Sequence, residues 1–200
     1  MGKWFKAMAV GLVIAISAQF MMGFASDCGE IREQVLRLHI LANSDSKEDQ
    51  QLKLAVRDRI LEESGELFET LGSKTEAEDS VKEHLAQIEE IARQEIEGQG
   101  YSYPVKAECV NMFFDTRVYE DFTLPAGQYD AVRITIGEAK GHNWWCVLYP
   151  MMCLPAAQPK EALEETFTAS QTEIIENSDD YQIEFATVEL IEKLKDWLSF

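Results

Sequence analysis

The chain has 200 residues, of which 46% are hydrophobic and 10% aromatic, so it is long and apolar enough to form a packed core. Its 36 acidic residues outnumber 18 basic ones and give a formal net charge of −18. A surface of this sign repels phosphates and anionic lipid headgroups, so the composition argues against proteins that bind nucleic acid or anionic membrane surfaces. It allows a soluble domain or one with a basic partner.

The N-terminus has the pattern of an export signal. Lys3 and Lys6 precede an uncharged apolar run at residues 7–22, and residues 23–25 place small side chains at the −3 and −1 positions of a cleavage site. We therefore expect a secretory signal peptide over residues 1–25. The alternative is an uncleaved anchor, because the apolar run is close to the length that spans a bilayer.

A strand and two helices should follow. Residues 30–43 alternate between wholly apolar and mixed positions, which predicts a strand with one buried face. The turn at residues 43–46 offers helix caps. Apolar residues at helical spacing then predict helices at about 47–71 and 75–97, and the second has a densely charged opposite face.

Several short strands come next in the predicted order. They cover about residues 103–114, 117–124, 128–137 and 145–149, with a tight turn at Pro125–Gly127. One strand, two helices and then several closely linked strands predict an α+β fold. We expect a largely antiparallel sheet with the two long helices packed on one face.

The C-terminal part changes character. We assign residues 26–155 to the exported domain and residues 156–180, which are acidic with little apolar periodicity, to an exposed linker. The alternative within this linker is a partial helix near residues 161–167. Residues 181–200 form the tail: a short strand is expected at 181–185, followed by an amphipathic helix. That tail either docks on the domain or binds a partner.

Four cysteines in an exported chain allow two disulfides in three possible pairings. Cys146 and Cys153 flank a proline and could close a short loop, while Cys28 and Cys109 could join the N-terminus to the sheet. The alternative is that some remain buried thiols. The Cys and His spacing does not fit zinc, so we expect no metal.

Two groups of reactive residues could form a catalytic or metal site, but each also has a simple structural explanation. Cys146 and His142 resemble a thiol hydrolase pair, but along a strand they would lie about 13 Å apart. His39, Asp45 and Asp49 could form a metal or acid–base set, although capping by Asp45 and a favourable position of Asp49 near a helix N-terminus explain them better. The sequence therefore favours a binding or signalling protein over an enzyme, with no cofactor and no small-molecule substrate.

Two long motifs are specific enough to indicate a family. The first reads RLHILANSDS at residues 37–46, and the second reads LPAGQYDA at residues 124–131 and continues with NWWCVLYP at residues 143–150. Together they resemble the signature of stage II sporulation protein R over about residues 34–155. Cys28 and Cys109 lie outside the shared pattern.

The resemblance implies a secreted signal of endospore-forming bacteria. Such a protein is made in the forespore and exported to the space between forespore and mother cell. It activates a membrane-embedded aspartic protease, its partner, which removes the pro-segment of the mother-cell factor sigma E. The alternatives are an exported Cys/His cell-wall hydrolase and a structural spore-envelope protein.

The partner-binding surface is predicted from polar and aromatic side chains that exceed what packing requires. Because successive strand residues point to opposite faces, one of the two adjacent tryptophans should point inward and one outward. Arg and Trp are frequent anchors of interfaces. The candidates are Arg37, His39, Asn43, Asn143, Trp144 and Trp145.

Overall fold

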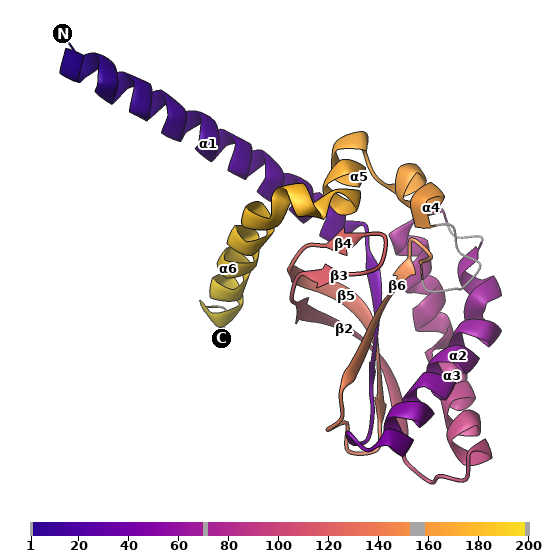
Figure 1. Cartoon of the computed structure of the whole chain (residues 1–200). Helices are drawn as coiled ribbons and strands as arrows, with labels where there is room; N and C mark the ends of the chain where they lie inside the picture. The colour runs from indigo at the N-terminus through magenta and orange to yellow at the C-terminus, as the bar shows by residue number, and fades with distance from the viewer. Residues whose placement is uncertain (1, 70–71, 153–158, 199–200) are drawn as a thin grey trace. The chain divides into compact units, whose positions relative to one another are not determined.

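The computed structural model describes residues 2–69, 72–152 and 159–198, with the side chains of residues 64–69 and 159–161 excepted. The chain forms two compact units (Figure 1). The sheet unit comprises residues 34–113 and 128–166, and the helical unit comprises residues 1–33, 114–127 and 167–200. This division differs from the predicted one, because both ends of the chain belong to the helical unit.

The sheet unit contains a four-stranded sheet in the order β2-β5-β1-β6. The strands are β1 (Leu36–Leu41), β2 (Val105–Phe114), β5 (Gly127–Ile136) and β6 (Asn143–Tyr149). β1 pairs antiparallel with β6 and parallel with β5, since the long connection through two helices lets β1 and β5 run in the same direction. The predicted α+β class with an antiparallel-rich sheet is confirmed, with this one parallel pair added.

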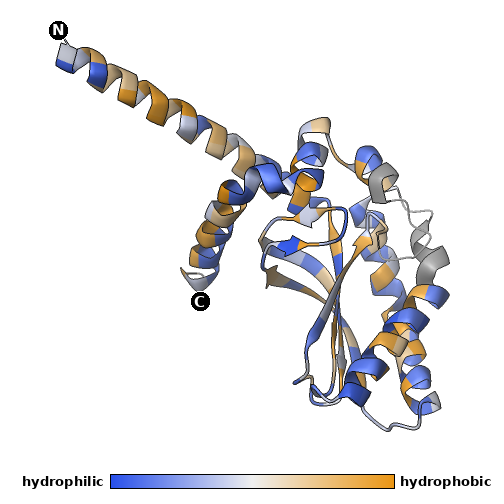
Figure 2. Cartoon of the chain, viewed as in Figure 1, coloured by the Kyte–Doolittle hydropathy of each residue, from blue (hydrophilic) through white to orange (hydrophobic). Residues whose placement is uncertain are grey.

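One face of the sheet carries the core. Helix α2 (Lys47–Glu69) contributes Leu52, Val56 and Ile60, and helix α3 (Lys74–Gly98) contributes an apolar stripe that includes Val81 and Ile88. They pack with the β-strand side chains that alternate toward the same face. Figure 2 shows both helices with apolar and polar residues interspersed along their length, as an amphipathic helix requires.

The helical unit is built around α1 (Gly2–Glu33), which is one unbroken helix. The first strand therefore starts at Leu36, and the predicted extension of this strand back to residue 30 is wrong. The short strands β3 (Arg117–Val118) and β4 (Thr123–Leu124) pair antiparallel in the same unit. The residues before the sheet are helical because their buried side chains recur at helical spacing.

The acidic segment, predicted as an exposed linker, is largely helical and partly buried. It contains α4 (Pro159–Thr166) and α5 (Ala169–Glu176), which is capped by a Thr168 capping box. Gln171, Ile174 and Ile175 of α5 are buried. Composition alone suggested that this segment is exposed, because its acidic residues are many and its capping and apolar residues are few.

The predicted strand at residues 181–185 is also wrong. A 3-10 helix, η1 (Ser178–Tyr181), leads directly into α6 (Gln182–Leu198). Phe185 and Val188 are the buried residues of α6, and their three-residue spacing fits a helix face. Alternation over five residues was too short a pattern to outweigh the packing of these side chains in the helical unit.

The expected disulfide between Cys28 and Cys109 is not formed, because both are free thiols. Cys28 lies on α1 with no exposed surface, while Cys109 is exposed on β2. The prediction placed Cys28 just before the first strand, but Cys28 belongs to α1 and its side chain is buried. Cys146 is disulfide-bonded. Its predicted partner, Cys153, lies outside the described residues, so that pairing stays a prediction.

Candidate functional site

Trp144 and Trp145 lie on opposite faces of the sheet. Trp144 pairs in register with Ile40 and packs against the helix-covered core, where the Arg57 guanidinium lies 4.9 Å from the centre of its ring. Trp145 pairs with His39, and the two rings stack on the other face with centroids 3.8 Å apart and planes 12° apart. The prediction that adjacent tryptophans diverge is therefore confirmed.

His39 is buried beneath this stack. Only 3% of its surface is exposed, and burial lowers its pKa to about 4 because the charged imidazolium is disfavoured away from water. A hydrogen bond with the Asn143 side chain acts in the opposite direction but is the smaller effect. His39 is thus neutral at pH 7 and holds Trp145 and Asn143 together at the start of β6.

Arg37 is also interior, although the sequence suggested a surface contact. Its side chain has no exposed surface, and its guanidinium lies 4.9 Å from the centre of the Tyr129 ring. Tyr129 belongs to the LPAGQYDA motif and is itself 1% exposed. The first and second motifs therefore meet inside the protein, and of the six candidates only Asn143 is exposed, while Asn43, Trp144 and Trp145 are half-buried.

A second feature, which we call the loop cluster, consists of Asn43, Ser44, Asp45, Asp49, Lys53 and His142. Its centre is the Asp49 carboxylate, which accepts hydrogen bonds from Asn43 Nδ2 at 2.8 Å and from Ser44 Oγ at 2.5 Å. These hydrogen bonds hold the pKa of Asp49 below its ordinary value, and the bond from the Ser44 hydroxyl has the largest effect. Asp49 is 4% exposed, so it is a buried, ionised hub at the start of α2.

The loop between β5 and β6 is fastened to this cluster. Asn43 Oδ1 accepts from the Glu138 backbone N–H at 2.9 Å, and Asp45 Oδ1 accepts from the His142 backbone N–H at 2.6 Å. The His142 ring also contacts Asp45, and this hydrogen bond lowers the pKa of the Asp45 carboxyl. Asn43 and Asp45 of the NSDS turn therefore hold the loop that leads into Asn143.

Lys53 of α2 is the remaining member of the loop cluster. Its Nζ donates to the Gln50 side-chain oxygen at 2.7 Å and to the His142 backbone carbonyl at 2.9 Å. Only 4% of Lys53 is exposed, and burial lowers its pKa. Lys53 was not among the predicted site residues, although it lies one helical turn after Asp49.

Two glycines allow the close approach of the loop to the turn. A Cβ on Gly141 would lie 2.2 Å from the Ser44 carbonyl oxygen, and one on Gly137 would lie 2.2 Å from Asn43 Oδ1. Gly137 also has a positive φ of +58°. Close packing of the loop against the turn therefore requires glycine at both positions. This packing fixes the position of the following residues Asn143 and Trp145.

The described residues do not form a Cys/His catalytic pair. Cys146 is buried on the core face, whereas His142 is exposed and bound to Asp45. Among the residues that the structure describes, three His, Cys, Asp or Glu side chains are nowhere grouped as a metal site requires. The candidate site is a surface formed by Asn143 and Trp145 at the edge strand β6.

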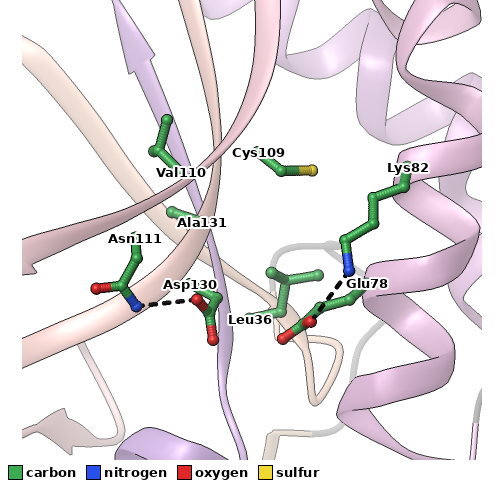
Figure 3. A pocket seen from close by; sticks show the side chains of 8 residues that line it. All are labelled: Leu36, Glu78, Lys82, Cys109, Val110, Asn111, Asp130 and Ala131. Atoms are coloured by element: carbon green, nitrogen blue, oxygen red, sulfur yellow. Dashed lines mark hydrogen bonds and ion pairs between the residues drawn. The ribbon is translucent and has the colours of Figure 1, made fainter.

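A hollow of about 170 Å³ lies between α3 and the strands of the sheet unit (Figure 3). Cys109, Asn111 and Asp130 line it from the strands, and Glu78 and Lys82 line it from α3. Lys82 pairs with Glu78 and Asn111 donates to Asp130, so the polar groups are bound to one another. Burial raises the pKa of the Cys109 thiol, which argues against a reactive thiolate there.

Comparisons with known proteins agree with the motifs. The family model described as stage II sporulation protein R matches residues 32–159. A curated relative, stage II sporulation protein R of Bacillus subtilis (strain 168), is 38% identical over 135 residues, which is 68% of this chain and 60% of the relative. The match thus spans less than two thirds of the relative's length. No solved structure matches the chain.

Proposed function

This chain belongs to the stage II sporulation protein R family, and from that premise we propose that it is an exported signal that activates a membrane-embedded aspartic protease. Activation then leads to processing of pro-sigma-E in the mother cell. Family membership places the chain in sporulation. The protease, the processing step and the space between forespore and mother cell are the proposed part.

Three features support this function. The N-terminal helix is long and apolar enough to cross a membrane, which is compatible with an export signal. Both motifs of the family form packing and hydrogen-bonded contacts in the described structure rather than a reaction centre. A protein whose shared residues build and orient a surface fits an activator better than a protease.

The observation that carries the proposal is the fixed presentation of Asn143 and Trp145. The loop cluster holds the chain immediately before Asn143, and buried His39 stacks on Trp145 from behind. A half-buried tryptophan that is already held in one orientation loses little conformational freedom when a partner covers it. We therefore propose Asn143 and Trp145 as the residues that contact the extracytoplasmic part of the protease.

The test is pro-sigma-E processing in a spore-forming host that carries Asn143→Ala or Trp145→Ala as its sole copy. We expect processing to fall at least tenfold while the amount of exported chain is unchanged. Trp197→Ala is the matched control, because Trp197 is 73% exposed and lies outside the family match. Normal processing in both site variants would refute the assignment of this surface.

Direct binding separates activation from a general folding defect. The purified chain is titrated with the exposed part of the protease, and both site variants should bind at least tenfold more weakly with an unchanged melting temperature. Arg37→Ala is unsuitable here, because removal of a fully buried guanidinium should destabilise the fold. Equal affinity of the wild type and both variants would overturn the proposed contact.

A further inference from the structure

The last third of α1 is part of the core of the helical unit. Phe24, Cys28 and Ile31 are buried on one helix face, with exposed fractions of 4%, 0% and 0%. The Phe24 ring stacks on Tyr181 with centroids 5.5 Å apart and meets Phe185 edge-on at 5.2 Å. These three positions follow the i, i+4, i+7 spacing of a packed helix face.

Polar contacts on the same stretch reinforce this packing. Ser170 donates to Asp27 at 3.1 Å, and Gln171 donates to Glu30 at 2.8 Å, so α5 is bound to α1. Arg32 donates to the Ala126 carbonyl at 3.0 Å and forms an ion pair with Glu192 of α6 at 3.6 Å. From Phe24 onward, α1 is therefore joined to η1, α5, α6 and the segment at Ala126.

The expected cleavage site falls inside this packed stretch. Cleavage after Ala25 would remove Phe24, and with it the ring that packs against Tyr181 and Phe185. Proteases prefer exposed, irregular segments, whereas Ala25 lies inside an unbroken helix. Processing at this site would thus both open the helix and take an aromatic side chain out of the core.

The preceding stretch has the length and polarity of a membrane span. Residues 7–23, which precede the packed Phe24, carry no charged side chain, and a helix of that length extends about 25 Å, at the short end of the range that spans a bilayer. Its apolar window is only 6% buried inside the protein. Lys3 and Lys6 precede it and Asp27 follows it, which places the N-terminus on the cytoplasmic side.

We propose that the N-terminal helix is retained as a membrane anchor, whose partner is the lipid bilayer, and that Phe24 joins this anchor to the folded domain. The chain then acts as a tethered ligand rather than a freely diffusing one. This inference does not rest on the proposed activation of a protease, since it concerns only the N-terminus and the helical unit.

The test follows the full chain with a C-terminal tag in a spore-forming host. Intact mass and N-terminal sequence should show an uncleaved chain in the membrane fraction that resists an alkaline wash. Ala25→Leu, which removes the small residue required at −1, provides the mass of an uncleaved standard and should match the wild type. A soluble wild-type chain that begins at Ser26 would overturn the proposal.

A pair of phenylalanine variants tests the packing separately. Phe24→Ala in the full chain in detergent should lower the melting temperature of the helical unit by about 10 °C, because it leaves a cavity in a packed cluster. Phe20→Ala is the matched control on the same helix, since Phe20 is 58% exposed. Equal melting of the two variants would show that Phe24 does not belong to the fold and would refute the inference.

Discussion

Acidification should weaken the sheet unit through His39. The pKa of His39 falls from 6.5 to about 4 on folding, chiefly because burial disfavours the imidazolium. Between these values the unfolded chain binds more protons than the folded one, so stability is fully present above about pH 6.5 and is lost as the pH falls toward 4. The linkage relation gives a loss of about 2 to 3 kcal/mol between pH 7.5 and pH 4.5.

The measurement is urea unfolding of the full chain in detergent at pH 7.5 and pH 4.5, followed by tryptophan fluorescence. His39→Phe is the comparison variant, because phenylalanine keeps an aromatic ring against Trp145 but does not titrate. The carboxylates Asp45 and Asp49 have lowered pKa values, so their contribution to the free energy of unfolding is lost only below about pH 4. It therefore does not affect the comparison between pH 7.5 and pH 4.5.

The variant should lose about 2 kcal/mol less stability than the wild type over the same pH interval. The difference between the two pH dependences isolates His39, since all other titrating groups are common to both proteins. Equal pH dependence in the two proteins would refute the claim that His39 is buried in its neutral form.

Two further predictions concern the loop cluster. Gly141→Ala should destabilise the fold by about 2 kcal/mol or more, because its Cβ would meet the Ser44 backbone at 2.2 Å, whereas Gly98→Ala, which meets nothing within 4 Å, should be nearly neutral in thermal unfolding. Asp49→Asn should lower the free energy of unfolding in urea by about 1 to 3 kcal/mol, because the Asn43 and Ser44 donors lose a charged acceptor. Asp58→Asn is the control, since Asp58 is exposed, and an equal effect of the two substitutions would contradict this role of Asp49.

Local pattern was sufficient for much of this fold. Periods of two and of about 3.6 residues predicted β1, the two long helices and the later strands, because each of these elements has one face against a core. Strand alternation alone also placed Trp144 and Trp145 on opposite faces. The two motifs indicated the family, which the comparisons then showed.

The loop cluster depended on contacts between residues far apart in the chain. Asn43 and Glu138 are 95 positions apart, and Lys53 and His142 are 89 positions apart, so their pairing follows from sheet register and not from spacing. For the same reason Arg37 and His39 looked like surface residues in the sequence. Their burial is decided by what packs around them, which a single strand does not contain.

The sequence by itself determined the apolar N-terminal segment, the element types of the sheet unit and the family, because these follow from local periodicity and contiguous motifs. Tertiary structure decided where α1 ends, since Phe24, Cys28 and Ile31 are helical core residues only in contact with α5 and α6. It also decided which candidates reach the surface, because exposure depends on long-range packing. Asn143 and Trp145 are held in place at the candidate site by buried His39.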